Sequence, residues 1–188
     1  MLDRLDDVPW QRLGHAYGAA TDVPGQLRDL LSDDVETRRV AIWQLGGNIV
    51  HQGSRWQASA YAVPFLLEIL AGPSPLTASE RVRLIELLGE LAIGDPSFYA
   101  SDEFPLDELR ADAAAGAHLM AAFETGPYGG DDFMDFLSDL DEPDQERLGA
   151  VLLLRVHEAV RAGKPLLERL RDSDPALREA ATGTLRWL

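Results

Sequence analysis

Two copies of one pattern, 33-DDVETRRVAIWQL-45 and 173-SDPALREAATGTL-185, carry the strongest structural signal in this chain. In both copies an aspartate is followed by arginine after four residues, alanine after seven and leucine after eleven. Alanine and leucine at this spacing share one face of an α-helix, and the small alanine lets a neighbouring helix approach closely. The aspartate precedes the apolar run, where it can accept hydrogen bonds from the first free amides. Each copy therefore predicts an amphipathic, N-capped helix through Asp34, Arg38, Ala41 and Leu45, or through Asp174, Arg178, Ala181 and Leu185.

A second pattern comes just before the first copy and recurs in the middle of the chain. Val23 and Val63 each begin the series Val-Pro-x-x-Leu-x-x-Leu, which predicts a partner for the helix that follows. Pro24 suits the first turn of a helix, where no amide hydrogen bond is lost. Pro64 has helical sequence on both sides, so we expect it to kink one long helix. The chain therefore reads as a series of helix pairs.

These repeats resemble HEAT repeats, in which antiparallel helix pairs stack into an α-solenoid. The likeness covers residues 23–92 and 132–186, with weaker copies of the second helix around Arg81 and Arg147. The segments 15-HAYGAATDVPGQL-27 and 51-HQGSRWQASAYAVPFLLEIL-70 also resemble a group of small bacterial HEAT-like proteins, which implies an architecture rather than an activity. The resemblance implies an all-α fold, a HEAT-like α-solenoid of about nine to ten helices. It implies one domain over residues 1–188 with an irregular acidic insert at 94–132.

The apolar periodicity predicts helices throughout, and no segment has the alternation of a strand or the signal of a hairpin. Turn-forming residues predict loops from Gly94 to Pro105 and from Thr125 onward. The predicted helices span residues 8–18, 24–32, 35–46, 55–71, 77–93, 105–124, 131–140, 144–162, 165–172 and 175–187.

The composition is typical of a soluble globular protein. The 188 residues are 46% hydrophobic and include no cysteine, which excludes disulfides and thiolate chemistry. The N-terminal residues lack the basic and apolar regions of a signal peptide. No apolar run approaches the ~20 residues that a membrane span needs. We therefore expect a cytoplasmic protein that does not contact a membrane.

The negative charge is concentrated in one third of the chain. Residues 95–146 hold fifteen acids and one base, a net charge of -14 out of the total of -15. Such a field repels nucleic acid and attracts basic proteins, so we expect a basic protein partner and no nucleic acid. A solvated acidic surface without a partner is the alternative. The predicted partner-binding residues are Asp102, Glu103, Tyr128, Asp131, Asp132, Asp135 and Asp139.

Signals for catalysis or metal binding are weak. The four histidines are widely separated, and His157 with Glu158 is the nearest approach to a metal-binding pair. The chain has no Gly-x-Ser-x-Gly nucleophile motif and no Asp-rich calcium loop. We therefore expect no catalytic residue, no metal and no cofactor.

A second candidate surface surrounds the segment 46-GGNIVHQGSRWQ-57. Its polar and aromatic residues are able to form a ligand pocket or a contact surface. The structural alternative is a turn in which Gly46 and Gly47 end one helix, Gly53 reverses the chain and Ser54 caps the next helix. The residues of this second surface are Trp43, His51, Gln52, Arg55, Trp56 and Tyr61.

These patterns favour a non-enzymatic module for protein–protein interaction. One concrete form is an immunity or antitoxin-like protein that neutralises a cationic toxin by covering it. The first alternative is an enzyme or small-ligand-binding protein that uses the region of His51, Trp56 and Tyr61. The second is a scaffold that self-associates through its C-terminal end, where Trp187 and Leu188 follow no capping helix.

Overall fold

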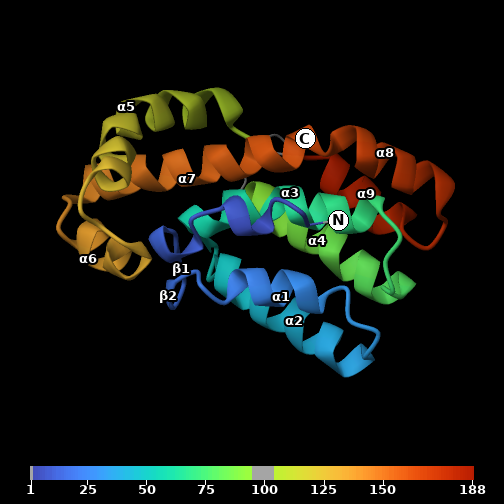
Figure 1. Cartoon of the computed structure of the whole chain (residues 1–188). Coiled ribbons are helices and arrows are strands. Elements are labelled where there is room, and N and C mark those ends of the chain that lie inside the picture. The colour runs from blue at the N-terminus through green and yellow to red at the C-terminus, as the bar shows by residue number, and fades with distance from the viewer. Residues whose placement is uncertain (1, 95–103) are drawn as a thin grey trace.

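The computed structural model describes residues 2–94 and 104–188, and in these ranges the protein is almost entirely helical (Figure 1). The predicted all-α class is confirmed at this level, although two short hairpins accompany the helices. In the described part of the chain, no helix combines the length and apolar character needed to cross a bilayer. The elements are η1 (Leu5–Asp7), η2 (Trp10–Arg12), β1 (Gly14–His15), β2 (Gly18–Ala19), α1 (Val23–Asp29), α2 (Val35–Ile49), β3 (Val50–His51), β4 (Ser54–Arg55), α3 (Gln57–Ala71), α4 (Ala78–Ile93), α5 (Leu106–Thr125), η4 (Gly130–Asp132), α6 (Phe133–Ser138), α7 (Glu142–Ala162), α8 (Lys164–Ser173) and α9 (Arg178–Leu185).

The helices pack as pairs. Helix α1 packs on α2, α3 on α4 and α8 on α9, while α5 lies along α7 (Figure 1). The pairs also contact one another, since α1 packs on α3, α2 on α4 and α4 on α9. Helix α7 contacts both α3 and α4. The α3–α4 pair is therefore the centre of the molecule, in contact with each of the other pairs.

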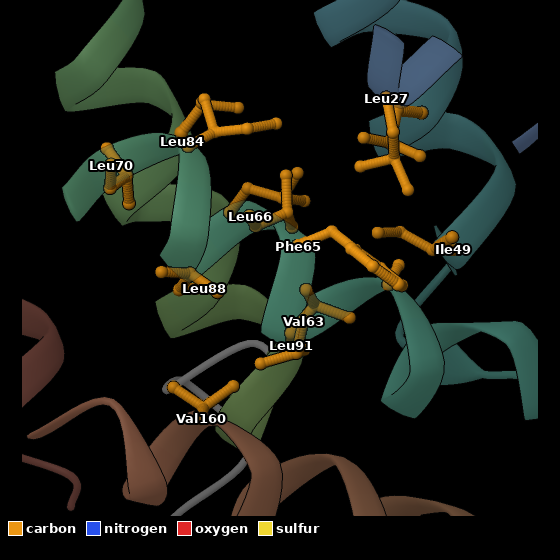
Figure 2. Close-up of a cluster of buried hydrophobic side chains, with 14 of the residues drawn as sticks. Leu27, Ile49, Val63, Phe65, Leu66, Leu70, Leu84, Leu88, Leu91 and Val160 are labelled. Carbon is orange, nitrogen blue, oxygen red and sulfur yellow. The ribbon is translucent and has the colours of Figure 1, made fainter. Parts of the chain in front are cut away.

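Buried aliphatic side chains from all these pairs form one large core. Figure 2 shows part of it, from Leu27 of α1 through Leu66 of α3 to Val160 of α7. A second, smaller cluster under α5, α6 and α7 is aromatic and includes Trp56, Phe123 and Phe133. Full burial of one such side chain contributes about 1.5–3 kcal/mol, so the two clusters hold the pairs together.

Two arginines connect neighbouring pairs in a similar manner. Arg38, near the start of α2, donates to a backbone carbonyl just beyond α1 (2.8 Å) and to Glu80 of α4 (3.0 Å). Arg81, near the start of α4, donates to the Leu70 carbonyl of α3 (3.4 Å) and to Asp174 ahead of α9 (3.2 Å). Each guanidinium thus reaches back to the chain at or just after the first helix of its own pair, and across to another pair.

The predicted helix over residues 8–18 is wrong. Two 3-10 turns and the β1–β2 hairpin occupy this segment, with His15 paired to Gly18. Gly18 has a φ of 125°, which a helix does not tolerate. Long-range hydrogen bonds also compete with a helix here, because the Gly14 amide donates to the Gln57 side chain (2.7 Å).

The segment after α2 also differs from its prediction. Gly46 and Gly47 lie inside α2, which continues to Ile49, and a β-hairpin follows in place of a simple turn. Its loop is Gln52 and Gly53, both with positive φ (49° and 79°), as a two-residue type I′ turn requires. Ser54 does not cap α3 as predicted, because α3 begins only at Gln57 and its N-cap is Trp56.

Other helix boundaries agree more closely with the sequence. Asp34 caps α2 as predicted, since its carboxylate accepts the Thr37 amide (2.8 Å). Pro64 lies inside α3. Asp174, by contrast, does not cap α9 as predicted: it accepts the Ala176 amide (3.0 Å) in a turn, and α9 begins four residues later with Leu177 at its N-cap. The predicted helix over residues 131–140 is divided between η4 and α6.

His157 is a buried histidine that makes folding sensitive to pH. Its ring stacks on Phe104 (4.6 Å between centroids), and its Nδ1 donates to the Ala92 carbonyl (3.1 Å). Burial, which disfavours the charged ring, lowers the pKa of His157 below its ordinary value of 6.5. Just below pH 6.5, the ring is therefore still neutral in the folded protein, whereas it already binds a proton in the unfolded chain.

We expect the free energy of unfolding to decrease as the pH falls below about 6.5, because the unfolded chain takes up a proton at His157 before the folded protein does. A His157→Phe variant has no proton to take up there. Urea unfolding should therefore show that the variant loses less stability than wild type between about pH 8 and about pH 5. A difference between the two proteins that stays constant over this range would exclude His157 as the titrating group.

Candidate binding surface

The predicted acidic surface lies at one end of the molecule. Residues 128–141, here called the acidic end, contain five aspartates and no basic residue. They form η4, α6 and the following turn, beyond the end of α5 and opposite the α8–α9 pair (Figure 1). Asp102 and Glu103, which the sequence also assigns to this surface, lie outside the described residues.

Two of the predicted aspartates stabilise the local fold. Asp131 accepts the amide of Ala19 in β2 (2.7 Å), and Asp132 accepts the amide of Gly129 (2.7 Å). A side chain at Gly18 would lie 2.6 Å from the Asp131 carboxylate, so glycine is needed for this contact. Asp131 and Asp132 remain exposed. Asp131 attaches the acidic end to the β1–β2 hairpin, and Asp132 holds the turn at Gly129 within the acidic end.

The other two aspartates have no such role. Asp135 and Asp139 are exposed, and neither carboxylate forms an ion pair with any residue in 2–94 or 104–188. Met134 directly precedes Asp135 in α6 and is 49% exposed. The concentration of charge in the sequence does not identify Met134. The signal in the sequence is an apolar residue that falls outside the buried face of a short helix. The acidic end thus offers an apolar side chain beside free carboxylates.

Tyr128 connects the acidic end to the aromatic cluster. Its ring stacks on Phe123 of α5 (5.3 Å, 9° between planes) and meets Phe136 of α6 edge-on (5.2 Å). Phe123 and Phe133 are almost completely buried beneath it. These contacts fix the position of Tyr128, which is still 36% exposed. The acidic end is therefore a surface supported by a packed aromatic base.

The second candidate surface is not one site, because its residues have separate surroundings. Arg55 donates to the carbonyls of Glu90 (2.6 Å) and Leu91 (3.0 Å) at the end of α4. Trp56 is buried against Phe133, and its Nε1–H has no acceptor among the described residues. The hollow that Trp56 lines includes neither His51 nor Tyr61.

The remaining residues of that surface also lie apart. Gln52 is in the hairpin loop, and His51 Nδ1 lies 3.3 Å from the hydroxyl of Tyr17 at the tip of the first hairpin. Trp43 is 77% exposed on the outer face of α2. Tyr61, on α3, lines a hollow together with Tyr128. The structure therefore joins Tyr61 to the predicted acidic surface rather than to His51.

A polar network that sequence reasoning missed joins three buried side chains to the exposed Asp22 and anchors the first hairpin. His15 Nδ1 accepts the Tyr17 amide (3.0 Å), so its Nε2 carries the proton and donates to Asp22 (2.8 Å). Asp22 also accepts from the side-chain amides of Gln26 and Asn48 (2.9 Å each). Both ring nitrogens of His15 are engaged, so the ring is placed to hold the hairpin. The available signal was Asn48, a polar residue on the apolar face of α2.

The C-terminal residues pack partly on the protein itself. Trp187 and Leu188 are partly buried and pack against the large core. Among residues 2–94 and 104–188, no group of three or more histidine or acidic side chains is arranged to hold a metal ion.

No protein-family model, curated protein or solved structure matches this chain. The resemblance to HEAT repeats therefore stays a prediction, and any functional argument depends on the surface itself.

Proposed function

We propose that this protein is a non-enzymatic interaction module that binds a basic protein at the acidic end. The observation that carries the proposal is the pair of exposed carboxylates of Asp135 and Asp139, which have no ion pair within the described ranges and lie beside the exposed Met134. Protein interfaces commonly surround an apolar contact with polar and charged groups. The field of five aspartates favours a partner that carries lysine and arginine.

We also propose that the helix pairs form a HEAT-like α-solenoid. The support is the shared role of Arg38 and Arg81, which lie 43 residues apart and each connect their own pair to another, α1–α2 to α3–α4 and α3–α4 to α8–α9. Such folds present extended surfaces for protein recognition. An immunity or antitoxin-like protein that covers a cationic toxin in the cytoplasm is the concrete form that we favour, because a single acidic end suits a single basic groove.

The proposal predicts that Asp135→Asn together with Asp139→Asn weakens retention of a basic protein from the producing cell by about tenfold or more, since each close charge pair at an interface contributes about 1.5 kcal/mol or more. The matched control is Asp29→Asn with Asp33→Asn, which removes the same charge from exposed residues of the α1–α2 pair. Binding would be measured by titration calorimetry at low and high salt. Equal losses in both double variants would mean that only net charge matters, and the acidic end would have no special role.

A further inference from the structure

Two hollows adjoin along α3, on the side of the molecule that faces the N-terminal turns. The larger is about 620 Å³ and lies between residues 3–9 and the outer face of α3. The smaller is about 270 Å³ and lies between η2, α3 and the end of α5. Both are lined by Pro9 and Tyr61, so they form one groove with Tyr61 between its two parts. We call it the Tyr61 groove.

The larger hollow suits a long basic side chain. Its apolar floor includes Val8 and Phe65, and the carboxylate of Asp7 lies beside it. Asp3 and Glu68 add negative charge to the lining, although Glu68 also accepts the Leu2 amide (3.0 Å). Arg4 is the one base among its lining residues, so the negative charge exceeds the positive. Lysine and arginine side chains bury an apolar stem and keep a charged end in a polar setting, and a cation is attracted to the face of a tyrosine ring.

The smaller hollow suits an apolar side chain. Tyr61, Tyr128, Phe123 and Leu13 line it, together with the polar residues Arg12, Gln57 and Glu124. The three polar residues are already engaged: Arg12 donates to the Glu124 carbonyl (3.2 Å), Gln57 accepts the Gly14 amide (2.7 Å), and the Glu124 carboxylate pairs with Arg155. The hydroxyls of Tyr61 and Tyr128 form no hydrogen bond within the described residues. Tyr128 also belongs to the acidic end, so the groove continues directly from that surface.

We propose that the Tyr61 groove holds an extended segment of the basic partner, with a lysine or arginine in the larger hollow and an apolar residue in the smaller one. Residues at i and i+2 of an extended chain point to the same side, which allows one segment to fill both hollows. This inference rests on the proposed function, because the segment belongs to the same partner that the acidic end attracts. The groove adds shape selection to a surface that otherwise recognises only charge.

The test uses short fluorescein-labelled peptides in which one threonine separates an arginine from a leucine. Matched peptides carry glutamate in place of the arginine, or serine in place of the leucine. Fluorescence anisotropy should show that the arginine–leucine peptide binds and that both replacements weaken it. Tyr61→Ala should weaken it by about tenfold, as expected for an aromatic anchor, while Tyr61→Phe should retain binding because the hydroxyl has no partner to lose. Asp7→Asn should weaken binding of the peptides that carry the arginine and leave binding of the glutamate peptide unchanged.

Trp43→Ala is the control, because it removes an exposed aromatic residue outside the groove. Unchanged peptide affinity in a folded Tyr61→Ala variant, or preference for the glutamate peptide, would overturn the inference. The same variants separate it from the proposed function. If Tyr61→Ala retains the basic protein while Asp135→Asn with Asp139→Asn releases it, the groove is not used and the proposed function stands. If neither change affects retention of the basic protein, both proposals are wrong.

Discussion

Replacing Arg38 with methionine is expected to lower the free energy of unfolding by about 3–5 kcal/mol, the usual effect of removing one member of a buried ion pair. The Arg38 side chain is 3% exposed and that of Glu80 is 12% exposed. Without the guanidinium, Glu80 keeps a charge in a poorly solvated position, and the carbonyls of Ser32 and Asp33 lose their donor. The α1–α2 and α3–α4 pairs lose one direct polar link and keep the hydrogen bond from Ser59 to the Ile49 carbonyl. Urea unfolding followed by circular dichroism measures the change.

Arg39 provides the matched control for this prediction. It follows Arg38 directly, but it is exposed and pairs only with exposed Glu36 on the same helix. Arg39→Met should change stability by about 0.5 kcal/mol or less, because exposed ion pairs contribute little. Similar losses for the two variants would show that general helix propensity, and not the link between pairs, accounts for the effect.

The contribution of the Arg38–Glu80 pair to stability also depends on pH. Burial alone would raise the pKa of Glu80, but hydrogen bonds from the Thr77 amide and from Arg38 outweigh it and place the pKa below the ordinary value of 4.5. The contribution of this carboxylate to stability is therefore complete above about pH 4.5 and is lost as the pH falls below that value. In the Arg38→Met variant one of the groups that lowers the pKa is gone, so this loss should become smaller.

Gly130→Ala is expected to destabilise the protein by about 1–3 kcal/mol, the usual cost of forcing an extra methyl group into a packed site. A Cβ at Gly130 would lie 2.3 Å from the Leu13 carbonyl oxygen and 2.8 Å from the Ala19 Cα. Both are backbone atoms, so no side-chain rotation relieves the contact. The acidic end would have to move away from the β1–β2 hairpin. The free energy of unfolding in urea measures the cost, and weaker binding of the basic partner should accompany it.

Gly129 is the control for the Gly130 substitution. A Cβ there would meet its nearest atoms at 3.6 and 3.7 Å, which is ordinary contact, and its φ of -107° is open to any residue. Gly129→Ala should therefore leave stability within about 0.5 kcal/mol of wild type. Equal effects at both positions would contradict the proposed close packing of the acidic end on the hairpin.

The helix pairs could be predicted because their signals are local. The spacing of Asp34, Arg38, Ala41 and Leu45 contains both the cap and the buried face of α2, and the structure has both. The hairpins could not be predicted with the same rules. Gly46 and Gly47 suggest a helix end, yet tertiary packing keeps them helical, and the hairpin of His15 depends on Asp22 and Gln57, whose positions are set by the fold.

The sequence predicts the charge of the candidate surface, but it does not predict which of its residues lie together. The concentration of acids identifies Asp135 and Asp139 from the sequence alone. The sequence also predicts Arg55 as a binding residue, but its guanidinium donates to two backbone carbonyls of α4 that lie 35 and 36 residues away in sequence. The meeting of Tyr61 and Tyr128 across one hollow likewise depends on the packing of α3 beside the end of α5. Contacts between distant segments decide which polar residues remain available for a partner.

Amide hydrogen exchange of the protein, alone and saturated with the basic protein that it retains, tests the central claim most directly. The account predicts slower exchange in residues 128–141 and around Tyr61 on α3 when the partner is bound, with α2 unchanged. Slower exchange around Trp43 on the outer face of α2, with residues 128–141 unaffected, would contradict it.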